Sequence, residues 1–157
     1  MNHKTLPDEK ITPNRKSKKR KVPLGPVPDL EEHVRPDWWR RIFNYLYLKT
    51  DGDVVEDINI TRWEVDLFQN ILQLSPEDKF LDLCCGQGRH ALELGRRNFK
   101  NIEGLDRSHY LIQKAKTLAK KEDINIKFRE GDARKIPCPP DTYDVVTILG
   151  NSFGYFD

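Results

Sequence analysis

The chain has 157 residues, of which 37% are hydrophobic and 33% charged, as is typical of a soluble globular protein with one ordinary core. Residues 1–21 hold eight Lys/Arg against two acids, so the net charge of +2 conceals a basic N-terminus and a slightly acidic remainder. Three cysteines without CxxC spacing argue against a disulfide framework and a metal site, and no apolar run has the length of a membrane span or a signal peptide core. We therefore expect an intracellular protein, cytoplasmic or, in a eukaryote, nuclear, without metal or membrane contact.

The first 30 residues are rich in Lys, Arg and Pro and nearly free of large apolar side chains. Such a segment cannot offset the entropy of ordering, so residues 1–30 are predicted to form a disordered basic tail. Within it, Arg15 to Lys21 reads RKSKKRK, a basic cluster typical of nucleic-acid contacts or of a nuclear address. A solvated arm that binds nothing is the alternative.

Residues 31–78 predict a helical extension ahead of the main domain. Asp37 can cap a helix whose apolar side chains follow at helical spacing: Trp38, Trp39, Ile42, Phe43 and Leu46. The sequence TDGD, residues 50–53, then predicts a turn. Thr61 and Glu64 form a T-x-x-E capping box for a second helix, which Ser75-Pro76 should end.

From Lys79 onward, short apolar runs alternate with helical patterns. Strands are predicted in four of these runs: FLDLCC (80–85), NIEGLD (101–106), INIKFR (124–129) and YDVVTILG (143–150). Helices are expected after the first run, to about Arg97, and after the second, from Ser108 to about Lys121. Strands that alternate with helices form parallel sheets with right-handed crossovers. Residues 79–157 therefore predict an α/β domain with helices on both faces of the sheet.

A glycine-rich turn joins the first predicted strand to its helix. Glycine lets the backbone approach a ligand, and the helix N-terminus supplies free N–H groups. Gly86, Gly88 and Ala91 satisfy the G-x-G-x-x-G/A spacing of a dinucleotide-binding site. Asp106, after the second strand, corresponds to the acid that binds the ribose in such a site. On spacing alone an NAD enzyme is allowed. Asp82 argues the other way, because a carboxylate inside a strand is costly unless a partner such as a ligand ammonium meets it.

With its motif LDLCCGQGRHALELG, this region resembles the class I S-adenosylmethionine (SAM)-dependent methyltransferases, whose Rossmann-like fold has seven strands. The resemblance implies SAM as cofactor, with Asp82 and the backbone of Cys84 to Gly88 at its methionine end. It also implies that Asp106 accepts from the ribose hydroxyls and that Asp132 and Ala133, in a Gly-Asp-Ala after the third strand, meet the adenine. The predicted cofactor-binding residues are Asp82, Cys84, Gly86, Gly88, Asp106, Arg107, Asp132 and Ala133.

No catalytic residue is assigned, because methyl transfer needs mainly proximity and in-line geometry, with a base only for a protonated acceptor. The segment GNSFGYFD (150–157) lacks the Asn/Asp-Pro-Pro-aromatic motif of nucleobase-directed members, so we expect a small-molecule acceptor of unknown identity. His90 and His109 are expected as surface or capping residues, and Cys84 and Cys85 as packing residues. Members often use N-terminal helices as a lid, and the aromatic residues here either cover the pocket or form a plain helix face: Trp38, Trp39, Tyr45 and Tyr47.

Four strands are predicted where the family fold has seven, so we expect a C-terminally truncated member with little or no activity. The fourth strand, VVTIL, is apolar on both faces, which is typical of a sheet interior. Left at an edge it would promote self-association. Two other functions stay open, a non-catalytic Rossmann-like module whose basic tail binds nucleic acid and an NAD(P)-dependent oxidoreductase.

Overall fold

The computed structural model of the chain describes residues 39–150 and Ser152. It divides the chain into two units, Met1–Val34 and Arg35–Asp157, of which the first lies outside the described residues. The predicted basic tail, the Asp37 cap, Trp38 and most of the segment 150–157 also lie outside them.

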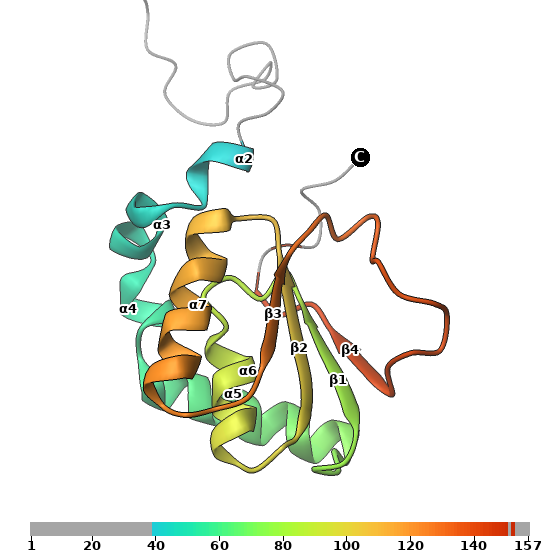
Figure 1. The fold of residues 1–157 in the computed structure, drawn as a ribbon. Coiled ribbons are helices and arrows are strands. Elements are labelled where there is room, and N and C mark those ends of the chain that lie inside the picture. Colours follow the sequence, from blue (N-terminus) through green and yellow to red (C-terminus); the bar gives the residue numbers. More distant parts are fainter. Residues whose placement is uncertain (1–38, 151, 153–157) are drawn as a thin grey trace, which may run out of the picture. The chain divides into compact units, whose positions relative to one another are not determined.

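Four parallel strands form one sheet in the order β3-β2-β1-β4. They span Lys79–Leu83 (β1), Asn101–Asp106 (β2), Lys127–Glu130 (β3) and Val145–Thr147 (β4), as Figure 1 shows. The predicted α/β class and parallel sheet are confirmed. The chain runs from β1 to β2 and β3 on one side and then adds β4 on the other side of β1, so the strand order reverses at β1, where open α/β sheets have a crevice at the carboxyl ends of the strands.

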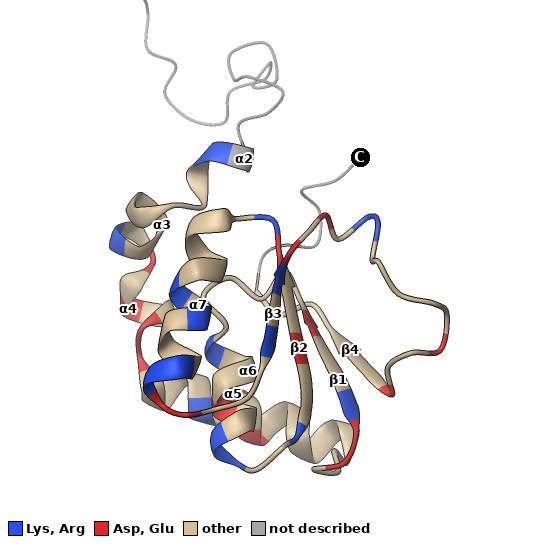
Figure 2. Cartoon of the chain, viewed as in Figure 1, with Lys and Arg blue, Asp and Glu red and all other residues tan. Residues whose placement is uncertain are grey.

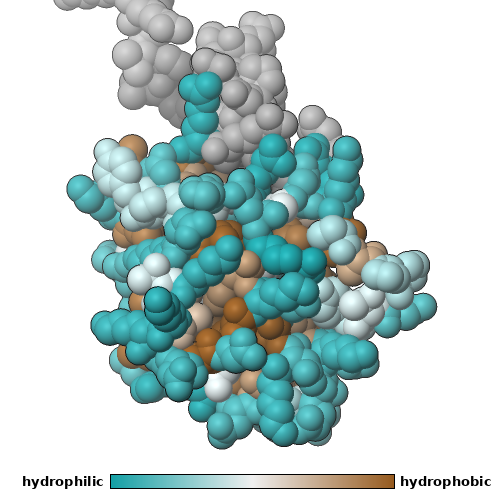
Figure 3. Space-filling view, in the orientation of Figure 1, coloured by the Kyte–Doolittle hydropathy of each residue, from teal (hydrophilic) through white to brown (hydrophobic). Residues whose placement is uncertain are grey.

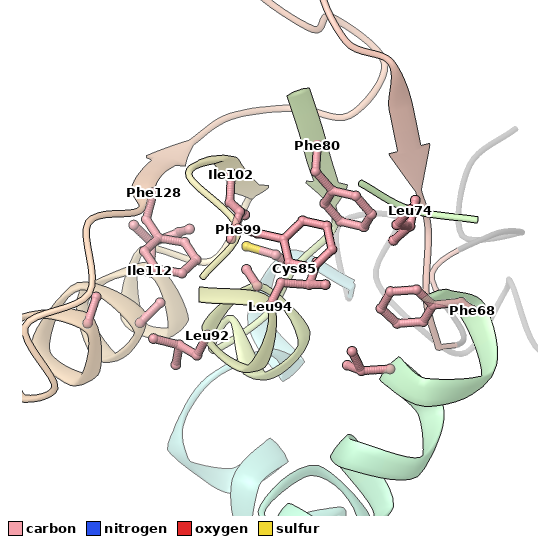
Figure 4. Close-up of a cluster of buried hydrophobic side chains, with 14 residues drawn as sticks. Phe68, Leu74, Phe80, Cys85, Leu92, Leu94, Phe99, Ile102, Ile112 and Phe128 are labelled. Carbon is pink, nitrogen blue, oxygen red and sulfur yellow. The ribbon is translucent and has the colours of Figure 1, made fainter. Parts of the chain in front are cut away.

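Three helices cover one face of this sheet: α5 (Ile58–Leu72), α6 (Arg89–Arg96) and α7 (His109–Lys121). Alternate strand residues point toward them, since successive side chains of a strand face opposite sides. Phe80, Ile102 and Phe128 project from three strands into a buried apolar cluster with side chains of all three helices, drawn in Figure 4. This cluster is the main core and fixes the loop after β1 against α6 and α7.

The opposite face carries a smaller cluster of Leu81, Leu83 and Leu105. The segment 131–144 covers it without helix or strand, and packs Ile136 and Tyr143 against these leucines. Helices were predicted on both faces, but in the described part of the chain they lie on one. The covering segment contains the run IPCPP, and proline removes backbone donors that a helix needs.

The first predicted helix is divided into two short ones. One helix was expected through Leu46, whereas α2 (Trp39–Ile42) ends before Asn44, whose side chain accepts from the N–H of Leu46 at 2.7 Å and caps α3 (Tyr45–Thr50). This side chain competes with the continuing helix for backbone donors. The predicted TDGD turn is a bend at Asp51 followed by a short helix, α4 (Gly52–Val55).

The predicted capping box at Thr61 is wrong. Helix α5 begins four residues earlier in the chain, capped by Asp57, whose side chain accepts from the N–H of Asn59 at 2.7 Å. Thr61 therefore lies inside the helix, buried, and its hydroxyl donates to the carbonyl of Asp57 at 3.0 Å. The helix begins at Asp57 because aspartate is a favourable N-cap and no residue between Ile58 and Thr61 interrupts a helix. The end of α5 at Leu72 agrees with the predicted stop before Ser75-Pro76.

Charged residues of both signs are interspersed on the face seen in Figure 2. In the same view hydrophilic side chains cover most of the surface, and hydrophobic ones show between them (Figure 3). Among the residues that the structure describes, no helix combines the length and the apolar character needed to cross a membrane.

Candidate cofactor site

A cavity of about 440 Å³ opens at the carboxyl ends of β1, β2 and β4. Its walls come from the turn after β1, the end of β2, the residues after β4 and the helices α2 to α4. Four carboxylates and two guanidinium groups line it: Asp51, Glu64, Asp82, Asp106, Arg89 and Arg107. The cavity is large enough for a small molecule, and its ionised lining would carry a net charge of −2.

Asp82 is the most unusual residue of this cavity. It is 1% exposed, and its Oδ2 has no hydrogen-bond partner within the described structure. Burial, with a smaller contribution from the charge of Asp106, raises the pKa of Asp82 to about 7, although Arg89 and a backbone hydrogen bond from Ala91 act in the opposite direction. A buried carboxyl oxygen that faces a cavity without a partner is most simply explained by a partner that a ligand brings.

The turn after β1 is held by the acid at the end of β2. Asp106 accepts through Oδ2 from the N–H of Gly86 at 2.8 Å and through Oδ1 from the N–H of Ser108 at 2.7 Å. Burial raises the pKa of Asp106 despite these hydrogen bonds. Each carboxylate oxygen has a second lone pair, so the group can still accept from ligand hydroxyls. Asp106 therefore both shapes the turn and faces the cavity.

Cys84 and Gly86 line the cavity with left-handed backbone, at φ of 60° and 56°. Burial, with a contribution from Asp106, raises the pKa of the Cys84 thiol to about 11, so it is protonated at neutral pH. Cys85 packs in the main core. Neither thiol is suited to act as a nucleophile, which agrees with the packing role expected for both.

Gly88 was predicted to contact the cofactor, but it does not line the cavity. Its φ is 76°, and a Cβ built there would lie 2.6 Å from the ring of Phe128. The structure thus requires glycine at this position for the left-handed cap of α6 and for close packing against Phe128.

Arg107 lines the cavity, whereas Asp132 and Ala133, which the resemblance assigned to the adenine, do not. Asp132 accepts from Arg107 Nη1 at 3.0 Å and from Arg134 Nη2 at 2.8 Å. Its hydrogen bonds from Arg134, with the nearby positive charge, hold the pKa of Asp132 far below its usual range. Ala133 packs against the leucine cluster of the second sheet face. The structure therefore brings together five of the eight predicted residues: Asp82, Cys84, Gly86, Asp106 and Arg107.

A polar cluster that the sequence did not reveal lies at the start of α6. Arg89 Nη1 donates to Glu64 Oε2, and to Thr61 Oγ1 at 3.1 Å. His90 Nε2 lies 2.9 Å from the same Glu64 oxygen. His90 was expected at the surface or in a cap, but it is 5% exposed, and burial together with the charge of Arg89 lowers its pKa to about 4. It is neutral at pH 7 and donates to Glu64 through Nε2–H. His109 is a surface residue, as expected: its side chain is exposed and pairs with Glu130.

The N-terminal helices contribute apolar walls. Phe43 and Tyr47 line the cavity and contact each other edge to face, with ring centroids 5.3 Å apart. Ser108 Oγ donates to the carbonyl of Phe43 at 2.5 Å, and Gln87 Nε2 to that of Val55 at 2.7 Å, so the segment is anchored to the turns after β1 and β2. The aromatic residues of this segment were expected either to cover the pocket or to form a plain helix face. Tyr47 lines the cavity, whereas Tyr45 is 52% exposed and does not.

Fold and site together are those of the α/β domains that hold a nucleotide-like cofactor at the carboxyl ends of their strands. Residues 80–157 match the methyltransferase domain family, and this part of the chain belongs to the class I SAM-dependent methyltransferases.

Among similar proteins is a demethylmenaquinone methyltransferase of Alkalihalophilus pseudofirmus, 28% identical over 113 residues that cover 69% of this chain and 48% of that enzyme. The 27-O-demethylrifamycin SV methyltransferase of Amycolatopsis mediterranei is 30% identical, over 71% of this chain and 41% of that one. A putative SAM-dependent methyltransferase of Methanococcus maripaludis shares the fold, with a TM-score of 0.65 and 19% identity over 73% of this chain and 54% of that one. The chain spans about half the length of the curated relatives that it matches.

Proposed function

We propose that this chain binds SAM and takes part in methyl transfer to a small-molecule acceptor. The observation that carries the proposal is the unpartnered Oδ2 of Asp82, buried beside the cavity at the carboxyl end of β1. The ammonium of the methionine group supplies the partner that this oxygen lacks. The excess of carboxylates around the cavity also suits SAM, which carries a net positive charge through its sulfonium.

The chain's own residues have defined roles in this proposal. Asp82 holds the ammonium, Asp106 accepts from the ribose hydroxyls, and the backbone from Cys84 to Gly86 approaches the methionine end. Asp132 keeps its proposed role at the adenine only if Arg107, its ion-pair partner, turns aside. Transfer itself needs the sulfonium methyl, the acceptor atom and the sulfur in line, which is a matter of positioning.

Small apolar acceptors agree with the relatives, whose names refer to a menaquinone precursor and a rifamycin. Phe43, Tyr47 and Val54 give this chain an apolar wall next to the cofactor cavity. We propose three parts for the chain, a basic tail over residues 1–30, a helical extension over 31–78 that supplies this wall, and the cofactor-binding domain over 79–157.

An NAD(P)-dependent oxidoreductase is the second candidate, favoured by the G-x-G-x-x-A spacing. A dinucleotide brings a pyrophosphate, and the net negative charge of the cavity lining, four carboxylates against two guanidinium groups, opposes an anion. Calorimetric titration of the chain with SAM and, separately, with NADH tests the proposal. Saturable binding of SAM at micromolar concentration without binding of NADH is expected, and the reverse order would establish the oxidoreductase.

The ribose acid provides a first prediction. Asp106→Ala should weaken SAM binding by about 1–3 kcal/mol, because the ribose hydroxyls and the N–H of Gly86 both lose an acceptor. Calorimetry on the folded variant measures this. Unchanged affinity would remove Asp106 from the site, and an exposed acid outside the cavity, Glu77→Ala, serves as the control.

The N-terminal tail provides a second prediction. Deletion of residues 1–30 should leave the melting temperature within about two degrees and SAM affinity unchanged, because the segment lacks apolar anchors.

We further propose that Arg15 to Lys21 is the chain's nucleic-acid contact. The shortened protein should then lose affinity for double-stranded DNA at low salt, and affinity that persists would exclude this cluster as the main contact.

The edge strand β4 provides a third prediction. Val146 is 51% and Ile148 40% exposed at this edge of the four-stranded sheet. Among the described residues β4 pairs with β1 alone. An edge strand with exposed apolar side chains favours pairing with a second copy, so we propose that the chain self-associates here. Val146→Lys should shift light scattering toward the monomer, while Thr117→Lys on exposed α7 should not. A wild-type monomer at high concentration would contradict the proposal.

A further inference from the structure

A second cavity, of about 200 Å³, lies among the helices α4 to α7. It takes no lining residue from a strand, whereas the cofactor cavity opens at the carboxyl ends of strands. Arg89, Leu92 and Arg96 line it from α6, and this spacing places them on one face of that helix. The second cavity is therefore a groove over α6, with α5 and α7 as its sides.

The lining of the second cavity carries an excess of positive charge. Arg89, Arg96 and Lys114 contribute three cations, and Glu56 is the one acid among the described lining residues. The acids that pair with the two arginines do not line this cavity: Glu64, Glu93 and Glu122. The cofactor cavity has the opposite balance, so the second cavity favours a ligand of opposite charge, an anion.

Two of these cations keep hydrogen-bond donors for an anion. Lys114 Nζ donates to Glu56 Oε1 at 2.6 Å, which uses one of the three donors of an ammonium. Arg96 uses three of the five donors of its guanidinium on Glu93 and Glu122. Both cationic side chains are 30% exposed, so a ligand can reach them from solvent. A carboxylate can accept from both while their ion pairs persist.

Gln87 is the most deeply buried polar residue of this lining, at 7% exposed. Its Nε2 donates to the carbonyl of Val55 at 2.7 Å, and its Oε1 is buried without a hydrogen-bond partner within the described structure. A buried amide oxygen in this state calls for a donor, such as a ligand hydroxyl. The remaining lining is mainly apolar, from Val55, Ile58, Leu92 and Leu118.

We propose that the second cavity binds a small organic carboxylate with an apolar body and a hydroxyl group. The carboxylate accepts from Lys114 and Arg96, the body packs on the apolar side chains, and the hydroxyl donates to Gln87 Oε1. The volume is below the roughly 300–1,000 Å³ of pockets for drug-sized ligands, so the ligand has on the order of ten non-hydrogen atoms. This site goes beyond the proposed function, because it is separate from the cofactor cavity and does not require SAM.

The test uses 4-hydroxybenzoate, which has a carboxylate, an apolar ring and a hydroxyl. Titration of the isotope-labelled full chain, followed by the amide signals in NMR spectra, should show saturable binding with a dissociation constant on the order of 1 mM. The largest shift changes are expected at Leu92, Lys114 and Leu118. Absence of saturation, or the largest changes at Cys84 and Asp106 of the cofactor cavity, would overturn the proposal.

Two relatives of the probe report on its two polar ends. The uncharged 4-hydroxybenzamide should bind about 10-fold more weakly, because it cannot form a charged hydrogen bond with Lys114 or Arg96. Benzoate, which lacks the hydroxyl, should bind about 3- to 10-fold more weakly, because Gln87 Oε1 then stays without a donor. If either compound binds as tightly as 4-hydroxybenzoate, the proposed mode of binding is wrong.

Lys114→Gln tests the cation directly, and its ion-pair partner Glu56 is 51% exposed, so the variant should fold. It should weaken binding of 4-hydroxybenzoate about 5- to 10-fold and leave the amide within about twofold. Lys116→Gln is the matched control, because it removes the same charge from an exposed position of α7 outside both linings. Equal weakening of acid and amide by Lys114→Gln, or the same loss in Lys116→Gln, would contradict the site. Loss of the preference for the acid in Lys114→Gln alone establishes it.

Discussion

Asp82→Asn should make the protein more stable and a poorer binder of SAM at the same time. Because the pKa of Asp82 is raised to about 7 from an ordinary 3.8, the folded protein binds this proton more tightly than the unfolded chain. The stability from this group is therefore complete below about pH 4 and is lost as the pH rises to about 7. Asparagine keeps the acceptor for Ala91 and removes a penalty on the order of 4 kcal/mol at pH 8.

The same substitution removes the charge that faces the ligand ammonium, so SAM affinity should fall by about 2–5 kcal/mol, the range for truncation of one partner of a buried charge pair. Thermal unfolding at pH 4, 6 and 8, with calorimetry at pH 8, measures both effects. Asp53→Asn, at an exposed position of α4 outside the cavity lining, should change neither. A variant with lower stability at pH 8 and unchanged SAM affinity would mean that Asp82 serves the fold alone.

Gly104→Ala should be the most damaging small substitution in the sheet. Gly104 lies on β2 beside Asp82, and a Cβ there would meet the Phe128 ring at 2.6 Å and Cys85 Sγ at 3.0 Å. Both neighbours are buried in the main core, so neither can move freely. We expect a loss of about 2–3 kcal/mol, as for overpacking of a dense core, and a melting temperature lower by about 5–10 °C.

A double-mutant cycle checks the cause. Phe128→Leu creates room, so Gly104→Ala/Phe128→Leu should be less destabilised than the sum of the single variants by about 1 kcal/mol. Gly52→Ala, whose Cβ would meet only Glu56 Oε2 at 3.8 Å, should change stability by less than about 0.5 kcal/mol. Additive effects in the cycle would show that contact with the ring is not the reason for glycine at 104.

Local patterns predicted the sheet well because its strands are short apolar runs between clear breaks. The run NIEGLD coincides with β2, and α7 ends at Lys121 as expected, with Ser108 as its cap. The order around β1 then follows from parallel connection rules. Asp82 could be singled out because a carboxylate within an apolar run contradicts the pattern around it, and the structure places it in the buried position that this implied.

The features that the sequence missed depend on contacts between distant segments. Glu64 reads as part of a capping box, and only the packing of α5 on α6 brings it to Arg89 and His90. The spacing singled out Gly88 for the cofactor, which stays a prediction, and only the position of Phe128 reveals that glycine is also needed there for packing. The helix boundaries in the N-terminal extension were wrong because the spacing of apolar residues does not show where a side chain caps a helix. Asn44 caps α3 and Asp57 caps α5, and both begin a helix at a position that this spacing did not indicate.

Proton release on ligand binding tests the central claim most directly. At pH 7 about half of the Asp82 carboxyls are protonated in the free protein, and a bound ammonium should ionise them. Titration of the chain with S-adenosylhomocysteine in two buffers of different ionisation enthalpy should therefore report release of about half a proton, and none in Asp82→Asn. Tight binding with the same enthalpy in both buffers, or equal proton release by the two proteins, would contradict Asp82 as the acid that receives the ligand's ammonium.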